Sequence, residues 1–329
     1  MNQTFSIQKL DSGGVITNYY CNSSCRHCHY RSGPLWPEQY MERSMAEYVF
    51  LTVKKLGCSS VHIGGGEPFL NQDRLCETVE AAKACGMAIE YIETSSSWYE
   101  DDFNASRIIN KLKNSGVSTL LVSISPFHNE HIPLIKVKNI LRICKENSMN
   151  VFDWNYSFLN ELELLDQSVP HSLSDLQQTF GEEYPQNIPS RYWISPGGRA
   201  LEFFKSIHHG ITIPALLSRN RGVCTELSSV DHFHIDLFGN YIPGLCSGLS
   251  IRLKDLGSPL DPEMYPIITT LTTRGIHGFL LYAMDRFGFE ASKASYLSKC
   301  ELCFEIRKFF VRTLQYDSIE LRPVEFYYM

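Results

Sequence analysis

The chain has 329 residues, of which 43% are hydrophobic and 20% charged, and its formal net charge is −6 at pH 7. This length and apolar content suit one large domain with a smaller one, while the acidic balance excludes the basic surface of a nucleic-acid-binding protein. The chain has no apolar run of about 18 residues, the minimum for a membrane span. Residues 1–11 lack the features of a signal peptide, so we expect a cytoplasmic protein with reduced thiols and no membrane partner.

Short apolar runs alternate with amphipathic stretches from residue 14 to about residue 200. The first amphipathic stretch repeats apolar residues at helical spacing, including Met45, Val49 and Val53, and stops at Gly57, a residue type suited to a helix end. The apolar runs predict strands at Val15–Tyr20, Ser60–Ile63, Ala88–Ile92, Thr119–Ile124, Asn150–Asn155 and Arg191–Ile194. This repeat predicts a parallel sheet with helices outside, either a partial barrel or an open doubly wound sheet.

Three cysteines, Cys21, Cys25 and Cys28, follow the first predicted strand in the run C-N-S-S-C-R-H-C. Three thiolates on one loop can bind three corners of a [4Fe–4S] cluster, a group that usually takes four cysteines. Because no fourth cysteine lies nearby, one iron would remain open to a ligand that is not protein. The alternative is a zinc site in which His27 or His29 is the fourth ligand, and the colour of the purified protein separates the two.

Glycine or polar residues follow the later predicted strands as well. In parallel α/β folds the active groups lie beyond the C-terminal ends of the strands, so we expect these residues to meet at one edge of the sheet. The candidates are Gly65, Gly66 and Glu67 after the second strand, Thr94 and Ser96 after the third, and Ser125 and His128 after the fourth.

Beyond about residue 210 the strand–helix repeat ends and a second group of cysteines begins. Two cysteines bracket a predicted β-hairpin, and two more lie one helical turn apart in a C-x-x-C pattern. Four converging thiolates imply zinc or an iron–sulfur cluster. The four residues are Cys224, Cys246, Cys300 and Cys303.

The C-N-S-S-C-R-H-C run, followed by Gly64-Gly65-Gly66-Glu67-Pro68 after the next strand, resembles the radical S-adenosylmethionine (SAM) superfamily over about residues 14–200. The resemblance implies a partial (β/α)6 barrel, which we assign to residues 1–209. It also implies that Cys21, Cys25 and Cys28 ligate a [4Fe–4S] cluster whose open iron binds SAM. In that family, an electron from the cluster cleaves SAM, and the 5′-deoxyadenosyl radical removes a hydrogen atom from the substrate.

The same resemblance assigns SAM-binding roles to several residues. Gly65, Gly66 and Glu67 match the segment that receives the SAM amino group, where glycines permit close backbone approach and a carboxylate suits an ammonium. Serine and threonine side chains suit the ribose hydroxyls and the SAM carboxylate, and His27 occupies a position that is often aromatic in the family. The residues outside the glycine segment are Thr94, Ser96, Ser125 and His27.

The second cysteine group resembles the twitch domain, a shortened SPASM domain of radical SAM enzymes. Gly239 matches its hairpin glycine, although the six residues between Gly239 and Cys246 require a bulge at the hairpin end. We therefore expect an α+β domain over residues 210–329 that holds an auxiliary [4Fe–4S] cluster on all four cysteines. Alternatively, Cys246 is a free thiol that donates a hydrogen atom to a substrate radical.

An auxiliary cluster favours oxidation of the substrate, a step that releases a proton and needs a general base. The candidate bases are His128 and Asp236, the latter on a hairpin face shared with His232 and His234. We expect a radical SAM oxidoreductase that acts on a small polar metabolite or natural-product intermediate with a flavodoxin or ferredoxin as electron donor. The alternatives are a maturase that oxidises, cross-links or epimerises a ribosomal peptide, and a non-catalytic metal scaffold that would not cleave SAM.

Overall fold

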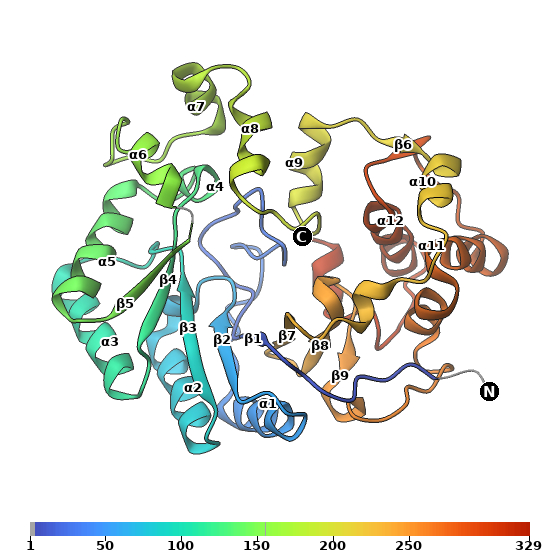
Figure 1. Cartoon of the computed structure of the whole chain (residues 1–329), viewed down its shortest axis with the longest axis horizontal. Coiled ribbons are helices and arrows are strands. Elements are labelled where there is room, and N and C mark those ends of the chain that lie inside the picture. Colours follow the sequence, from blue (N-terminus) through green and yellow to red (C-terminus); the bar gives the residue numbers. More distant parts are fainter. Residues whose placement is uncertain (1–3, 155) are drawn as a thin grey trace.

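An open sheet runs through the middle of the computed structural model, which describes residues 4–154 and 156–329 (Figure 1). In this part of the chain the main sheet has eight strands, in the order β5-β4-β3-β2-β1-β7-β8-β9. The strands are β1 Gly13–Ile16, β2 Ser60–Gly64, β3 Ala88–Thr94, β4 Thr119–Ser123, β5 Asn150–Trp154, β7 Phe233–Asp236, β8 Asn240–Ile242 and β9 Ile251–Arg252. The shorter pair β6 Ile211–Thr212 and β10 Ser295–Tyr296 forms a separate antiparallel sheet.

The first five strands are parallel and joined by helices, as the sequence repeat predicts. Each connecting helix buries an apolar stripe against the sheet; that of α1 includes Val49, Phe50 and Val53, and Gly57 beyond it takes a positive φ of 99°. The connecting helices are α1 Arg43–Lys55, α2 Gln72–Ala84, α3 Asp102–Asn114 and α5 Leu134–Glu146. They cover the outer side of the sheet (Figure 1), so the α/β prediction is confirmed.

The predicted sixth strand at Arg191–Ile194 is wrong. Arg191 ends helix α8 Tyr184–Arg191, and the residues after it form no ladder with any described strand. The alternation that suggests a strand is real, since Tyr192 and Ile194 are buried whereas Trp193 is 65% exposed. An apolar pattern on one side shows that a segment packs against the core, but it does not show that another strand pairs with that segment. The remaining helices of this half are α4 Pro126–Asn129, α6 Leu159–Leu162, α7 Leu173–Phe180 and α9 Ala200–Ile207.

Strand β7 takes the free side of β1, where it pairs in parallel with Gly13–Ile16. It then forms the predicted hairpin with β8 around Gly239, and the extra residues before Cys246 form a 3₁₀ turn, Pro243–Leu245. The sheet therefore contains strands from both sides of the predicted domain boundary at residue 209. One hydrophobic core joins β1 and α1 to the C-terminal helices.

The C-terminal helices pack beside this end of the sheet (Figure 1). They are α10 Ile213–Arg219, α11 Pro266–Phe287 and α12 Lys299–Arg312. Ser298 caps α12 by accepting a hydrogen bond from the Glu301 amide at 3.3 Å, which fixes the start of the helix, where Cys300 and Cys303 lie. Among the described residues, no helix combines the length and apolarity needed to span a bilayer.

Candidate functional site

The structure brings the three cysteines of the first loop together at one cavity. Cys21, Cys25 and Cys28 line a cavity of about 320 Å³ near the C-terminal ends of β2, β3 and β4, a size typical of small-molecule sites. All three are free thiols. Burial raises the pKa of Cys21 to about 12, so that thiol is protonated at neutral pH until a metal ion stabilises its thiolate and displaces the proton. The donor set thus fits an iron–sulfur cluster.

The cysteine loop is held in shape by Arg199, which precedes α9. Its Nε donates to the Cys25 carbonyl at 3.0 Å, its amide donates to the Cys28 carbonyl at 3.0 Å, and its guanidinium also reaches the Ser32 carbonyl. Arg199 therefore uses much of its hydrogen-bonding capacity on the backbone that presents the thiols. It positions this loop, a role that the sequence does not reveal.

The glycine segment after β2 lies directly against the backbone that leads into Cys21. The Gly66 amide donates to the Asn18 carbonyl at 2.7 Å, and the Glu67 amide donates to the Tyr20 carbonyl at 3.2 Å. Asn18 strengthens the junction through its Nδ2, which donates to the Tyr20 carbonyl at 2.7 Å. Gly65 and Gly66 both line the cavity, so the cysteine loop and the glycine segment form adjoining parts of one wall.

Gly66→Ala is expected to disrupt this wall, because an added Cβ would lie 2.0 Å from the Tyr20 carbonyl oxygen. The contact is with backbone, so the cysteine loop must shift. We expect at least about a tenfold loss of SAM affinity, the scale of loss when supporting contacts of a metal site are removed. Equilibrium dialysis with labelled SAM measures the change.

The matched control is Gly222→Ala, whose added Cβ meets no atom within 4 Å. Equal SAM affinity in the two variants would show that tight packing at Gly66 is unimportant for binding.

Glu67 does not present its carboxylate to the cavity. The side chain is fully buried and accepts hydrogen bonds from the Ser95 amide at 2.7 Å, the Thr94 hydroxyl at 3.1 Å and the Phe69 amide at 3.2 Å. Burial raises its pKa, although these hydrogen bonds oppose the shift. The expected direct contact between Glu67 and an ammonium group is therefore not supported; Glu67 instead joins the ends of β2 and β3.

The other predicted SAM-binding residues divide into two groups. Thr94 and His27 line the cavity, and His27 stacks on Phe127 with ring centroids 5.0 Å apart. Ser96 and Ser125 are buried outside the cavity lining. The Ser125 hydroxyl caps α4, where it accepts from the His128 amide at 3.3 Å and lies 2.7 Å from His128 Nδ1.

The two predicted bases lie in different surroundings. His128 lines the cavity, and burial lowers its pKa to about 4, which makes it neutral at physiological pH. Asp236 is fully buried and is not among the lining residues. Its carboxylate accepts from the Tyr19 hydroxyl at 2.9 Å and from the Asn240 amide at 2.9 Å, so it stabilises the β7–β8 turn.

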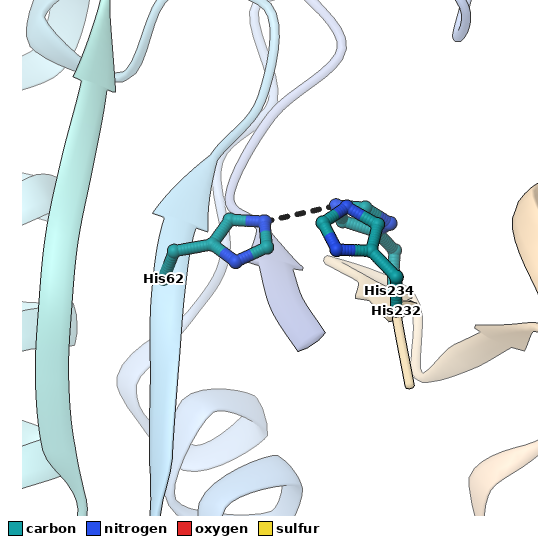
Figure 2. Close-up of side chains that lie close together, drawn as sticks. All are labelled: His62, His232 and His234. Carbon is teal, nitrogen blue, oxygen red and sulfur yellow. Dashed lines mark hydrogen bonds between the residues drawn. The ribbon is translucent and has the colours of Figure 1, made fainter. Parts of the chain in front are cut away.

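Two residues at or beside the cavity, Glu93 and His62, escape sequence analysis. Glu93 on β3 lines the cavity, and burial together with the nearby Glu67 charge raises its pKa to about 7. His62 on β2 meets His232 and His234 from the β7 segment, as Figure 2 shows. Glu93 lies just beyond the predicted strand Ala88–Ile92, and His62 lies inside the predicted strand Ser60–Ile63, so no motif marks either residue.

The second cysteine group converges on another cavity, of about 230 Å³. Burial raises the pKa of Cys246 to about 12 and that of Cys300 to about 11. The buried Arg307 also lines this cavity and supplies a cation beside the thiols. The donor set fits an iron–sulfur cluster with four thiolate ligands. The four cysteines are Cys224, Cys246, Cys300 and Cys303.

The two cavities share a wall at His29 and Leu245. His29 Nε2 lies 2.6 Å from the Leu245 carbonyl oxygen and donates a hydrogen bond to it. His29 directly follows Cys28, and Leu245 directly precedes Cys246. One hydrogen bond therefore connects the two cysteine-bearing loops, while Cys246 itself lines the second cavity and not the first.

Comparison with known proteins gives one family and several distant relatives. Residues 15–154 match the family described as the radical SAM superfamily. A probable GTP 3′,8-cyclase of Pyrococcus horikoshii is 26% identical over 121 residues, which cover 37% of this chain and 36% of the relative. The putative peptide biosynthesis protein YydG of Bacillus subtilis strain 168 is 27% identical over 175 residues, 53% of this chain and 50% of the relative.

The matches thus span half or less of the length of these curated relatives. Among solved structures, native anSMEcpe with bound AdoMet is similar with a TM-score of 0.46 and 13% identity, over 93% of this chain and 97% of that one.

Proposed function

We propose that this chain, which carries a radical SAM domain over residues 15–154, cleaves SAM reductively and removes a hydrogen atom from a small polar metabolite or natural-product intermediate. The observation that carries this proposal is the single cavity lined by Cys21, Cys25, Cys28, Gly65 and Gly66. When bound there, a [4Fe–4S] cluster and SAM supply one-electron cleavage of the sulfonium.

The chain's own residues would bind the cluster and enclose the SAM site. The three thiolates bind the metal, while Arg199 fixes the carbonyls of Cys25 and Cys28 through hydrogen bonds of 3.0 Å. Gly66 leaves room for the close packing of the loop. His27, stacked on Phe127, offers an aromatic surface at the cavity for a flat purine.

The test is production of 5′-deoxyadenosine by anaerobically reconstituted protein with dithionite. Cleavage should also proceed with a reduced flavodoxin or ferredoxin, the proposed physiological donors. A reconstituted protein that binds iron but gives no 5′-deoxyadenosine with either reductant would refute the proposal and favour the scaffold alternative.

We further propose that the second cavity holds an auxiliary [4Fe–4S] cluster, which would accept an electron from the substrate. Support comes from four cysteines and a buried Arg307 around one cavity. The His29–Leu245 hydrogen bond provides a short connection between the two cysteine loops. Oxidation of the substrate releases a proton, and a base within the first cavity must accept it.

Glu93 is the base that best fits this step, and its raised pKa of about 7 predicts the pH dependence. Below that pH the carboxyl is protonated and cannot accept a proton; above it the carboxylate is charged and can. Product formed per SAM cleaved should therefore rise with pH, by about tenfold per unit below the pKa, and level off above it.

In Glu93→Gln this rise should disappear, because glutamine does not titrate. The matched control is Glu90→Gln, an exposed position on the same strand. Product yields are measured by mass spectrometry between pH 5.5 and 8.5. An unchanged pH profile in Glu93→Gln would assign the proton to another group.

A second candidate function is modification of a ribosomal peptide. It is favoured by the similarity to a putative peptide biosynthesis protein and by Trp193, an aromatic cavity-lining residue that is 65% exposed and available to a long substrate. Reactions in which peptides and sugars compete, followed by mass spectrometry for deuterium transfer into 5′-deoxyadenosine, separate the two functions.

A further inference from the structure

Three histidine side chains meet beside β1, and two of them line the cavity that the first cysteine group also lines. His62 on β2 and His234 on β7 are both aligned with Gly14 of the intervening strand β1. Their Nε2 atoms are 3.0 Å apart, and one nitrogen from each of His62, His232 and His234 lies within 4.8 Å of the others. Figure 2 shows the rings turned toward one another across the space above β1.

Glycine at position 14 makes this meeting possible. A Cβ there would lie 2.1 Å from His62 Nε2, so any larger residue would displace the ring. The His62 ring is further fixed by stacking against Tyr91, with centroids 5.0 Å apart and an interplanar angle of 7°. The two strands that flank β1 and a stacked tyrosine therefore hold the imidazoles in place.

The chemistry of the group matches that of a metal site. Three imidazoles are a common ligand set for zinc, with a fourth position left for water or substrate. His232 and His234 line the same cavity as Cys21, so that fourth position would face the cavity. Burial lowers the pKa of all three histidines, which keeps them in the neutral form that binds metals.

The surroundings also leave polar atoms unsatisfied. His234 Nδ1 and the Tyr30 hydroxyl are buried and have no hydrogen-bond partner in the described part of the chain, and the two rings lie 5.3 Å apart. Buried polar atoms normally have a partner. A metal ion with its water or substrate ligand would bring such partners to this end of the cavity. Glu93 Oε1, 3.9 Å from His62 Nε2, is close enough to hold that water.

We propose that His62, His232 and His234 form a binding site for one divalent cation of the zinc class, with its open position directed into the cavity. Such an ion would bind an oxygen or nitrogen atom of the substrate and hold it facing the cysteine loop. The metal site does not depend on SAM cleavage, so its failure and that of the proposed function can be observed separately.

The test uses the reconstituted protein, in which iron occupies the cysteines. After equilibration with Zn²⁺ and desalting, elemental analysis should find one zinc per chain in addition to the iron. The zinc X-ray absorption spectrum should show nitrogen neighbours at about 2.0 Å rather than sulfur at about 2.3 Å. Zinc binding should weaken at least about 100-fold, the upper end of the loss from an outer-shell change, in His62→Gln and in His232→Ala.

His232→Ala alters an exposed residue and so tests the site even if His62→Gln fails to fold. The control is His209→Ala, an exposed histidine elsewhere, which should retain zinc. The proposal is overturned if no zinc is retained, if sulfur surrounds the zinc, or if the folded His232→Ala variant binds zinc as tightly as the parent. In each of those outcomes the histidines form only a hydrogen-bonded group.

Discussion

Replacing Cys25 with alanine should abolish SAM cleavage, with a loss of at least about 10³-fold, the scale expected when an essential member of a catalytic unit is removed. Cys25 is 8% exposed, and its carbonyl is held by Arg199 at 3.0 Å. Cys25 lines the first cavity, and among the described residues the only other cysteines that line it are Cys21 and Cys28. Two thiolates cannot hold the three corners of a cube.

Iron content gives an independent measure of the same change. With two clusters the parent should contain about eight irons per chain, and Cys25→Ala about four. Cys85→Ala is the matched control, because this cysteine lies at the end of α2, outside both cavities. Full SAM cleavage by Cys25→Ala would remove the basis of the proposed function.

Replacing Cys300 and Cys303 together with alanine should have the opposite effect to Cys25→Ala: SAM cleavage should remain, and oxidation of the substrate should be lost. Both cysteines lie in the first two turns of α12 and line the second cavity, so the double alanine variant loses half of the ligands there. We expect about four irons to remain, SAM cleavage to persist, and oxidised product to disappear. Iron analysis, electron paramagnetic resonance of the reduced protein and product mass spectrometry provide the measurements. Oxidised product at the parental rate would exclude an electron-accepting role for this cavity.

Cys246→Ala then separates the two interpretations of that residue. If Cys246 is a cluster ligand, the Cys246→Ala variant should lose as much iron as the double variant. If Cys246 is a hydrogen-atom donor, the variant should keep its iron, but its product should no longer gain a hydrogen atom from the protein. Its thiol lines the second cavity together with Cys300 and Cys303, and not the first, which favours the ligand.

Much of the fold could be predicted because its signals are local. Each connecting helix carries its own apolar stripe, and the first five strands follow from that repeat. The wrongly predicted strand at Arg191–Ile194 shows the limit, since burial of every second residue resembles a strand even where no described strand pairs with the segment. The position of β7 beside β1 depends on contacts between distant parts of the chain, which no local pattern encodes.

The site could also be predicted only where its signals are local. Both cysteine groups are recognisable from spacing, and each lines one cavity. The direction of the Glu67 side chain depends on Thr94 at the end of β3 and on Ser95 directly after it, and the motif does not contain these partners. His62 resembles a core residue in an apolar strand, and its meeting with His234 requires the register of both strands against Gly14.

The pairing of β1 with β7 also governs when this protein can fold. Gly13 pairs with Phe233, 220 positions later, so during synthesis one side of the first strand has no partner until most of the chain has left the ribosome. Pairings between such distant segments form slowly, and an unpaired strand edge invites association with other chains. Production in cells should therefore benefit from chaperones that shield the nascent sheet.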